Sequence, residues 1–503
     1  MNTSFQDIYY GFLVALEYQN LLYCMAGVVM GTLVGILPGL GPVAAMSLLF
    51  SATLHIPPVS GIIMLAGIYY GAQYGGSTTS ILLNLPGEAS SVVTCLDGYQ
   101  MARQGKAGQA LGISAFGSFI GGTLSVMGIM LLAPPLANFA LKFGFAEYFS
   151  LMCLGLVVVS FLAQGSMIKA IMMAAVGLFL GTVGMDLMVG KPRFNFGISV
   201  LMDGVGLLPV VMGLFGVSEV MLNLEASTDR QVFKTKLSHL YPSLQDWKDS
   251  IGAMIRGSII GFFLGILPGG GAFVGSFASY AVEKKISRHP EKFGKGAIEG
   301  VAGPETANNA ASGGAFIPLL TLGIPANAVM AVLLGLLLAH GVQVGPMLLK
   351  HHSDIFWGVI ASMYIGNVML MVLNLPLIGI WVKLLKVPYL ILFPFILLFC
   401  VIGAYSLNYS SADVYMMLLF SVIGYFLKKF HYEPAPLVLA LVLGPLMENA
   451  LRQTLIISQG GFLIFFTHPI SAIILSIAVV LLISPFIPGL NRSRKRWEES
   501  DIA

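Results

Sequence analysis

Two runs of small polar side chains stand out in an otherwise apolar chain. The first is Gly75-Gly-Ser-Thr-Thr-Ser80 and the second lies within Pro304–Gly314. Hydroxyl and amide groups supply the oxygen ligands that Na⁺ takes and the donors that hold a carboxylate. The residues predicted to contact a bound substrate are Ser77, Thr78, Thr79, Asn308, Asn309 and Ser312. Small polar residues also pack transmembrane helices together, so packing is the alternative for each one taken singly.

Two Pro-Gly turns are the second candidate element. Gly35-Ile-Leu-Pro-Gly-Leu-Gly41 recurs as Gly265-Ile-Leu-Pro-Gly-Gly-Gly271. Proline lacks an amide donor and glycine tolerates positive φ, so each turn is predicted to break a helix. Broken backbone at membrane depth is tolerated where it is buried in protein or lines a wet cavity. The start of the following helix then points amide hydrogens at an anion.

The turn residues predicted to bind the substrate are Gly35, Pro38, Gly39, Gly41, Pro268, Gly269, Gly270 and Gly271. The alternative is that both turns are kinks that only ease helix packing. That alternative does not explain why both breaks follow the same Gly-Ile-Leu sequence.

Four residues beside these motifs are predicted to couple transport to an ion: Asn84, Glu88, Glu305 and Asn327. A carboxylate at membrane depth is expensive and is by default a functional candidate. For Glu88 the alternative is a structural cap on a half-helix, and for Glu305 it is a place at the membrane interface. Four further acidic residues are expected at the interface: Asp97, Asp186, Asp203 and Glu219.

Composition places these motifs in lipid. The 503 residues are 57% hydrophobic and 10% charged, whereas soluble domains carry roughly 25% charged residues. A spanning helix needs about 20 apolar residues. We therefore predict an all-α polytopic membrane protein with about ten to twelve transmembrane helices plus re-entrant or broken helices. The net charge of +3 is too small to indicate a nucleic-acid partner.

The chain offers no enzyme signature. HExxH, GxSxG and Walker P-loop sequences are all absent from it, and the absence of the last argues against an ATP-driven pump. The four cysteines lack CxxC spacing and are expected to be buried thiols. We predict a protein that is not an enzyme and uses neither metal nor cofactor besides a coupling Na⁺ or H⁺.

An internal repeat organises the chain. After each Pro-Gly turn a Gly-Gly pair leads to a second turn, Leu85-Pro-Gly-Glu88 in the first copy and Ile324-Pro-Ala-Asn327 in the second. An ordered series of such matches is better explained by duplication than by chance. The predicted parts are membrane repeat 1 (10–224), a cytoplasmic linker (225–256), membrane repeat 2 (257–460), a final transmembrane helix (461–490) and a basic cytoplasmic tail (491–503).

Basic residues predict the orientation. The positive-inside rule places the Arg103 loop, the linker, Lys428-Lys429 and the C-terminus in the cytoplasm. It leaves the N-terminus, which has no Lys or Arg before Arg103, and the Lys350 loop in the periplasm. The Arg103 and Lys350 loops hold equivalent places in the two repeats, so the repeats are predicted to be inverted, a recurring design of secondary transporters.

Longer motifs give a family resemblance. Gly67-Ile-Tyr-Tyr-Gly-Ala-Gln-Tyr-Gly-Gly-Ser77 and Glu299-Gly-Val-Ala-Gly-Pro-Glu-Thr-Ala-Asn-Asn309 closely resemble the large membrane (permease) subunit of the tripartite tricarboxylate transporters, from about residue 20 to beyond 460. In that family the Pro-Gly loops and the Asn-Asn segment correspond to Pro38–Gly41, Pro268–Gly271 and Asn308-Asn309. One departure is Gly323-Ile-Pro-Ala326, where members often carry a final glycine.

The resemblance implies a secondary active importer of organic acids, driven by a Na⁺ or H⁺ gradient across the bacterial inner membrane. It also implies two partners, a periplasmic solute-binding protein and a small four-helix membrane subunit. We expect import of a di- or tricarboxylate such as citrate, with an anion channel or uniporter as the alternative. A membrane-embedded enzyme would need a nucleophile–base pair that the sequence does not offer.

Overall fold

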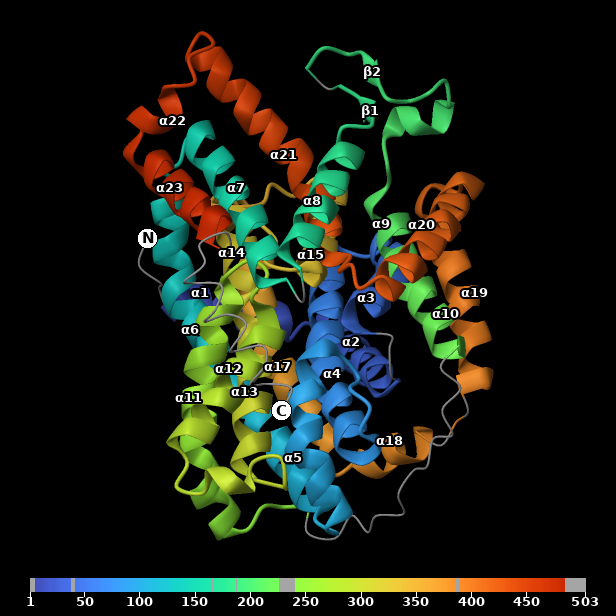
Figure 1. The fold of residues 1–503 in the computed structure, drawn as a ribbon, viewed down its shortest axis with the longest axis vertical. Helices are drawn as coiled ribbons and strands as arrows, with labels where there is room; N and C mark the ends of the chain where they lie inside the picture. The colour runs from blue at the N-terminus through green and yellow to red at the C-terminus, as the bar shows by residue number, and fades with distance from the viewer. Residues whose placement is uncertain are drawn as a thin grey trace. The chain divides into compact units, whose positions relative to one another are not determined.

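The computed structural model describes residues 5–37, 41–163, 166–186, 188–225, 240–385, 387 and 389–484. Within these residues the chain is almost entirely helical, apart from one ribbon of two short strands, β1 (Gly184–Met185) and β2 (Pro192–Arg193) (Figure 1). Nine helices of the described part are long and apolar enough to cross a membrane, and four shorter apolar helices accompany them. The predicted fold class, an all-α polytopic membrane protein, is confirmed.

The described residues form two compact units. One lies within Met1–Leu141 and Gly206–Phe430, and the other within Lys142–Val205 and His431–Ala503. The first unit contains the described parts of both Pro-Gly turns and both polar runs. Pro38, Gly39 and the predicted basic tail (491–503) lie outside the described residues.

The first unit is built from two series of helices. The first series comprises α1 (Phe5–Ala15), α2 (Tyr18–Ile36), α3 (Gly41–Thr53), α4 (Pro58–Leu83), η1 (Ala89–Ser91), α5 (Val92–Arg103), α6 (Ala107–Ala140), α9 (Leu207–Val211), η3 (Met212–Val217) and α10 (Ser218–Glu225). The second comprises α11 (Leu244–Ile266), α12 (Gly271–Ile286), η4 (Pro290–Lys292), α13 (Glu299–Gly314), α14 (Phe316–Leu322), α15 (Ala328–Ala339), α16 (Leu348–His351), α17 (Ser353–Asn374), α18 (Ile378–Leu384), α19 (Tyr389–Asn408) and α20 (Ser411–Lys429).

Both Pro-Gly motifs end a helix, as predicted. Helix α2 ends at Ile36 and α3 begins at Gly41, which has φ +56°. Helix α11 ends at Ile266 and α12 begins at Gly271, with a turn between them in which Gly269 has φ +79°. The backbone leaves the helix at these places, so the turns are more than kinks. Helix α11, with 23 residues, is longer than the half-helix expected there and begins inside the segment predicted as linker, where Ser243 and Asp246 form a capping box.

Glycines at four-residue spacing let the long helices approach closely. A Cβ at Gly27, Gly31 or Gly35 of α2 would collide with the backbone of α4, and one at Gly261 or Gly265 of α11 would collide with that of α13. Figure 1 shows α11, α12 and α13 side by side, in agreement with their contacts. Small residues at helix contacts are the usual device for packing in lipid, where burial of apolar surface provides no driving force.

The second unit is smaller. It comprises α7 (Phe145–Leu162), α8 (Met167–Gly181), the β1–β2 ribbon, η2 (Ser199–Asp203), α21 (Ala435–Ile457), α22 (Ile464–Thr467) and α23 (Pro469–Ile483). Helix α21 packs on α7 and α8, and α23 packs on α7. Arg193 and Arg452 both pair with Glu448 and Asp186, which ties the ribbon to α21.

Candidate functional site

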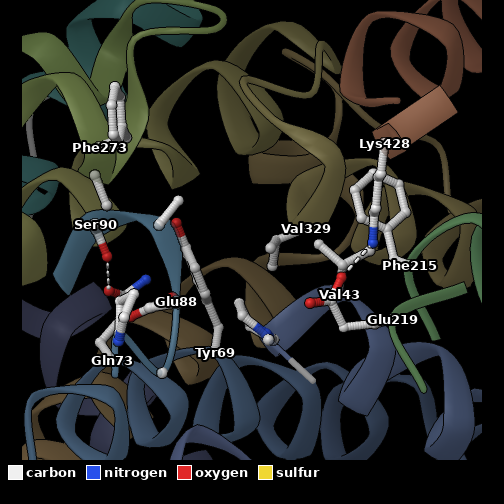
Figure 2. A pocket seen from close by; sticks show the side chains of 16 residues that line it. Val43, Tyr69, Gln73, Glu88, Ser90, Phe215, Glu219, Phe273, Val329 and Lys428 are labelled. Carbon is white, nitrogen blue, oxygen red and sulfur yellow. Dashed lines mark hydrogen bonds and ion pairs between the residues drawn. The ribbon is translucent and has the colours of Figure 1, made fainter. Parts of the chain in front are cut away.

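A pocket of about 470 Å³ lies inside the first unit, a size typical of small-molecule sites. Helices α3, α4, α10, α12, α15 and α20 contribute to it, together with η3 and the turn before η1. Its lining consists of Gly41, Pro42, Val43, Tyr69, Gln73, Pro86, Gly87, Glu88, Ala89, Ser90, Phe215, Glu219, Ala272, Phe273, Val329 and Lys428. Figure 2 shows these side chains around the cavity.

Three helices begin at this pocket. Gly41–Val43 open α3, Ala272 and Phe273 lie in the first turn of α12, and Val329 lies in the first turn of α15. The first four amides of a helix have no partner within that helix. Together with the helix dipole they favour a bound anion. The Pro-Gly breaks therefore produce two of the three helix starts, as the sequence predicts.

One side of the pocket carries an unpaired carboxylate oxygen. Glu88 occupies the N-cap position of η1, in keeping with the capping alternative, but its Oε1 is buried and has no hydrogen-bond partner in the described part of the chain. Ser90 donates a hydrogen bond to Oε1 of Gln73 at 3.0 Å on the same side. Asn327, the N-cap of α15, donates to the hydroxyl of Tyr69 at 3.3 Å. Glu88 thus lines the pocket and keeps one carboxylate oxygen without a partner among the described residues.

The other side carries an ion pair. Lys428, in the last turn of α20, contacts the carboxylate of Glu219 on α10, and its Nζ lies 6.0 Å from the centre of the Phe215 ring. Figure 2 shows the Glu219–Lys428 pair and the Glu88 group at opposite sides, with Tyr69 and Val329 between them. The polar groups of the pocket are therefore divided into two ends.

The hydroxyl run of α4 lies outside the lining of this pocket. Ser77, Thr78 and Thr79 are all buried. Thr79 donates to the carbonyl of Ile36 at 2.9 Å, which holds the end of α2 just before the first Pro-Gly turn. Thr78 lines a separate cavity of about 10 Å³, room for about one water molecule.

Glu305 joins the two polar runs. It is fully buried on α13 and accepts hydrogen bonds from Ser77 of α4 and Thr94 of α5. Ser114 and Ser118 of α6 also face it. Its side chain is therefore enclosed by protein and exposed neither to lipid nor to water. Among the described residues it has no Lys, Arg or His partner.

The asparagines of α13 are buried beside Glu305. Asn309 donates to the carbonyl of Glu305 at 3.1 Å, and Ser312 donates to that of Asn308 at 3.0 Å. Neither polar side-chain atom of Asn308 has a partner in the part of the chain that is described. Since buried polar atoms are normally hydrogen-bonded, these residues remain candidates for a ligand outside the main pocket.

The second Pro-Gly turn contacts the turn that precedes α15. The amide of Gly269 donates to the carbonyl of Ala326 at 2.8 Å. This bond places the start of α12 next to the start of α15. Asn84, which ends α4 with φ +55°, is exposed and lies outside the pocket lining.

Sequence reasoning missed several lining residues. Tyr69, Gln73 and Phe273 were not singled out, Lys428 was read only as part of a cytoplasmic basic pair, and Glu219 was expected at the interface. Nothing local signals the Glu219–Lys428 pair, because its members are 209 residues apart.

Asp97, which the sequence predicts at the membrane interface, links α5 to α12 and to the segment before α13. Its side chain is fully buried and accepts hydrogen bonds from the hydroxyl of Tyr280 at 2.9 Å and from the amides of Gly296 and Ala297 at 2.7 and 2.8 Å. These donors compensate the carboxylate for the lost water.

Comparison with family models identifies one family for this chain. Residues 21–439 match the family described as Tripartite tricarboxylate transporter TctA. An uncharacterized 52.8 kDa protein in the TAR-I ttuC' 3' region of Agrobacterium vitis is 51% identical over 486 residues, 97% of each chain. A second uncharacterized protein of that organism, in its TAR-II ttuC' 3' region, is 52% identical over 234 residues, 46% of this chain and 97% of its own. No solved structure matches.

Proposed function

The chain belongs to the tripartite tricarboxylate transporter TctA family, and from this premise we propose that it imports a small di- or tricarboxylate, such as citrate, by coupling to Na⁺ or H⁺. Membership makes it a multi-pass membrane protein and the permease subunit of a tripartite transporter. The substrate, the coupling ion and the inward direction belong to our proposal.

The observation that carries the proposal is the convergence of three helix starts and Lys428 on one pocket. First-turn amides and an ammonium group suit a carboxylate. Pro42 of α3 has no amide hydrogen and Asn327 caps the Met330 amide of α15, so the remaining first-turn amides carry this role. Val43, Val329 and Phe273 supply apolar surface for the carbon chain. A cavity of about 470 Å³ accommodates an acid with a short carbon chain.

Charge balance in the pocket favours a coupled cation. Glu88 and Glu219 are acidic and Lys428 is basic, so the charged residues that line the described pocket leave one net negative charge when all are ionised. An anionic substrate adds to that charge, and like charges in a partly desolvated site repel strongly. A Na⁺ bound at Glu88, or a proton on it, removes the repulsion. We therefore propose that Glu88 binds the coupling ion beside the substrate.

Glu305 is a second candidate for coupling. A carboxylate surrounded by hydroxyls and lacking a basic partner in the described part of the chain is an oxygen-rich site that suits Na⁺ or a proton. Asn308 and Asn309, whose side-chain oxygens are unpartnered in the described structure, lie on the same helix. Asn84 and Asn327 end and begin helices at the second turns, and in our proposal they position these turns around the coupling ion.

The inverted repeats belong to the same proposal. The packing of α2 on α4 through glycines parallels that of α11 on α13, and the packing of α8 on α21 parallels that of α20 on η3. Such matched contacts support duplicated halves of 10–224 and 257–460. We propose that the N-terminus is periplasmic and the C-terminus cytoplasmic, in the bacterial inner membrane.

The proposed partners are a periplasmic solute-binding protein and a small four-helix membrane subunit. The test is uptake by proteoliposomes that contain the full-length chain with both partners. Radiolabelled citrate and succinate are supplied with a Na⁺ gradient, a pH gradient or neither. We expect accumulation that requires one of the gradients. Steady single-channel conductance, or flux that is indifferent to both gradients, would support an anion channel or uniporter instead.

A further inference from the structure

The Glu219–Lys428 pair lies in the pocket lining rather than on an outer surface. Its side chains are 26% and 20% exposed, so both charges are partly removed from water. Lys428 and Glu219 come from α20 and α10, which pack together. Because a partly buried ammonium is costly without a partner, the carboxylate of Glu219 compensates the charge of Lys428.

The Glu219–Lys428 pair and the Glu88 group lie at opposite ends of the pocket. Figure 2 shows the pair at one end and Glu88, Gln73 and Ser90 at the other. Val329 and the ring of Tyr69 lie between the two ends. An acid with a single carboxylate satisfies one end only. With the coupling ion on Glu88, an acid with two carboxylates can place one of them at each end.

On the basis of the proposed function, we infer that Lys428 binds the second carboxylate of the substrate and that Glu219 holds Lys428 in place until the substrate arrives. An ammonium has three N–H donors, so Lys428 has the capacity to turn one of them toward the incoming carboxylate. Glu219 is exposed enough to regain water as its contact with Lys428 loosens. The pair therefore selects acids with two or more carboxylates over monocarboxylates.

The same two helices carry a matched control. Lys429 pairs with Glu225 at 2.8 Å, and these side chains are 40% and 53% exposed. Tyr425 also donates to Glu225, at 2.9 Å. This second pair has the same chemistry and similar positions in the sequence, but it lies outside the pocket lining.

The experiment measures equilibrium binding to the purified full-length chain in lipid nanodiscs. Succinate is the dicarboxylate probe and butyrate is the monocarboxylate of equal chain length. In Lys428→Met we expect the Kd for succinate to rise by about 10- to 100-fold, the effect of one hydrogen bond between charged groups. The Kd for butyrate should change less than about twofold, and Lys429→Met should leave both values within about twofold of the wild type.

A second pair of variants separates binding from folding. Glu219→Gln removes the competitor for Lys428 and should lower the Kd for succinate, whereas Glu225→Gln should not. The charge-neutral double variant Glu219→Gln/Lys428→Met, checked by gel filtration, covers the case in which Lys428→Met alone fails to fold, and it should show the weakened succinate binding without a change for butyrate.

Two results would overturn the inference. One is that Lys428→Met, or the double variant in its place, binds succinate as tightly as Lys429→Met does. The other is that Glu219→Gln weakens succinate binding, which would make the pair a structural support. If the wild type binds no organic acid at all, the proposed function itself fails, and this outcome is distinguishable from both.

Discussion

Glu305 accepts a hydrogen bond from the hydroxyl of Ser77, although 228 residues separate the two in the chain. The bond joins α4 of the first predicted repeat to α13 of the second. The sequence predicts that Ser77 contacts the substrate directly. In the structure its hydroxyl instead takes part in the contact between α4 and α13. This contact and three others in the protein lead to testable predictions.

Glu305→Ala should destabilise the protein. The substitution removes the acceptor of the buried Thr94 hydroxyl, at about 1–3 kcal/mol for an unsatisfied buried group, whereas the hydroxyl of Ser77 still donates to the carbonyl of Gln73 at 3.1 Å. Thermal unfolding in detergent measures the effect as a lower Tm. Glu305→Gln keeps an acceptor and should be nearly as stable as the wild type, yet it should lose gradient-driven uptake if Glu305 binds the coupling ion. An unchanged Tm for Glu305→Ala would contradict the described contacts.

Glu88→Gln should uncouple substrate binding from the ion. Removing the Glu88 carboxylate, one oxygen of which has no partner among the described residues, takes away the site at which a cation offsets the substrate's charge. We expect carboxylate binding to lose its dependence on Na⁺ or pH while the Kd at saturating ion changes by less than about tenfold. Glu291→Gln, at an exposed position in η4, is the control and should retain the dependence. An ion dependence in Glu88→Gln equal to that of the wild type would rule out this role.

Gly269→Ala should weaken substrate binding beyond its effect on stability. Gly269 has φ +79° and donates to Ala326, so a side chain there strains the turn that begins α12. The strain is about 1–2 kcal/mol for an ordinary residue in the left-handed region. Gly294→Ala is a matched control, because Gly294 has φ +78° and open space around it. Both variants should lose similar stability, and only Gly269→Ala should raise the Kd for succinate. If Gly269→Ala and Gly294→Ala have the same Kd for succinate, the turn at Gly269 does not contribute to substrate binding.

The carboxylate of Asp186 should make the thermal stability of the protein depend on pH in the acidic range. Burial acts to raise its pKa, but the amides of Met188 and Val189 and the guanidinium of Arg452 outweigh burial and hold the pKa below its ordinary value. Because the pKa of Asp186 is lower in the folded than in the unfolded state, its ionised carboxylate stabilises the folded protein at pH values above the unfolded-state pKa of about 3.9. This stabilisation is lost as the pH falls through the folded-state pKa.

The check is the Tm of Asp186→Asn between pH 3 and pH 7. The variant should be less stable than the wild type at pH 7, and the difference should shrink as the pH falls below about 4. Asp203→Asn, at an exposed position of η2, should follow the wild type throughout. A difference that stays constant with pH would mean that the carboxylate charge is not the stabilising feature.

The sequence by itself determined the features that depend on local chemistry. Apolar runs with few charges specify helices in lipid, since unpaired backbone is excluded from the hydrocarbon region. Pro268 and Gly269 end α11 because the first lacks an amide donor and the second adopts positive φ. The family also followed from the sequence, since its long motifs are contiguous in the chain.

Only the tertiary structure decided which polar groups face the pocket. Residues 60–82 of α4 are all buried, so the helix has no solvent-facing stripe whose period would reveal its orientation. Tyr69 and Gln73 therefore face the cavity, and Ser77 faces Glu305, without any pattern that distinguishes them. Lys428 and Glu219 meet through the packing of α20 on α10. Such contacts depend on how distant helices pack, and spacing along one helix does not encode that packing.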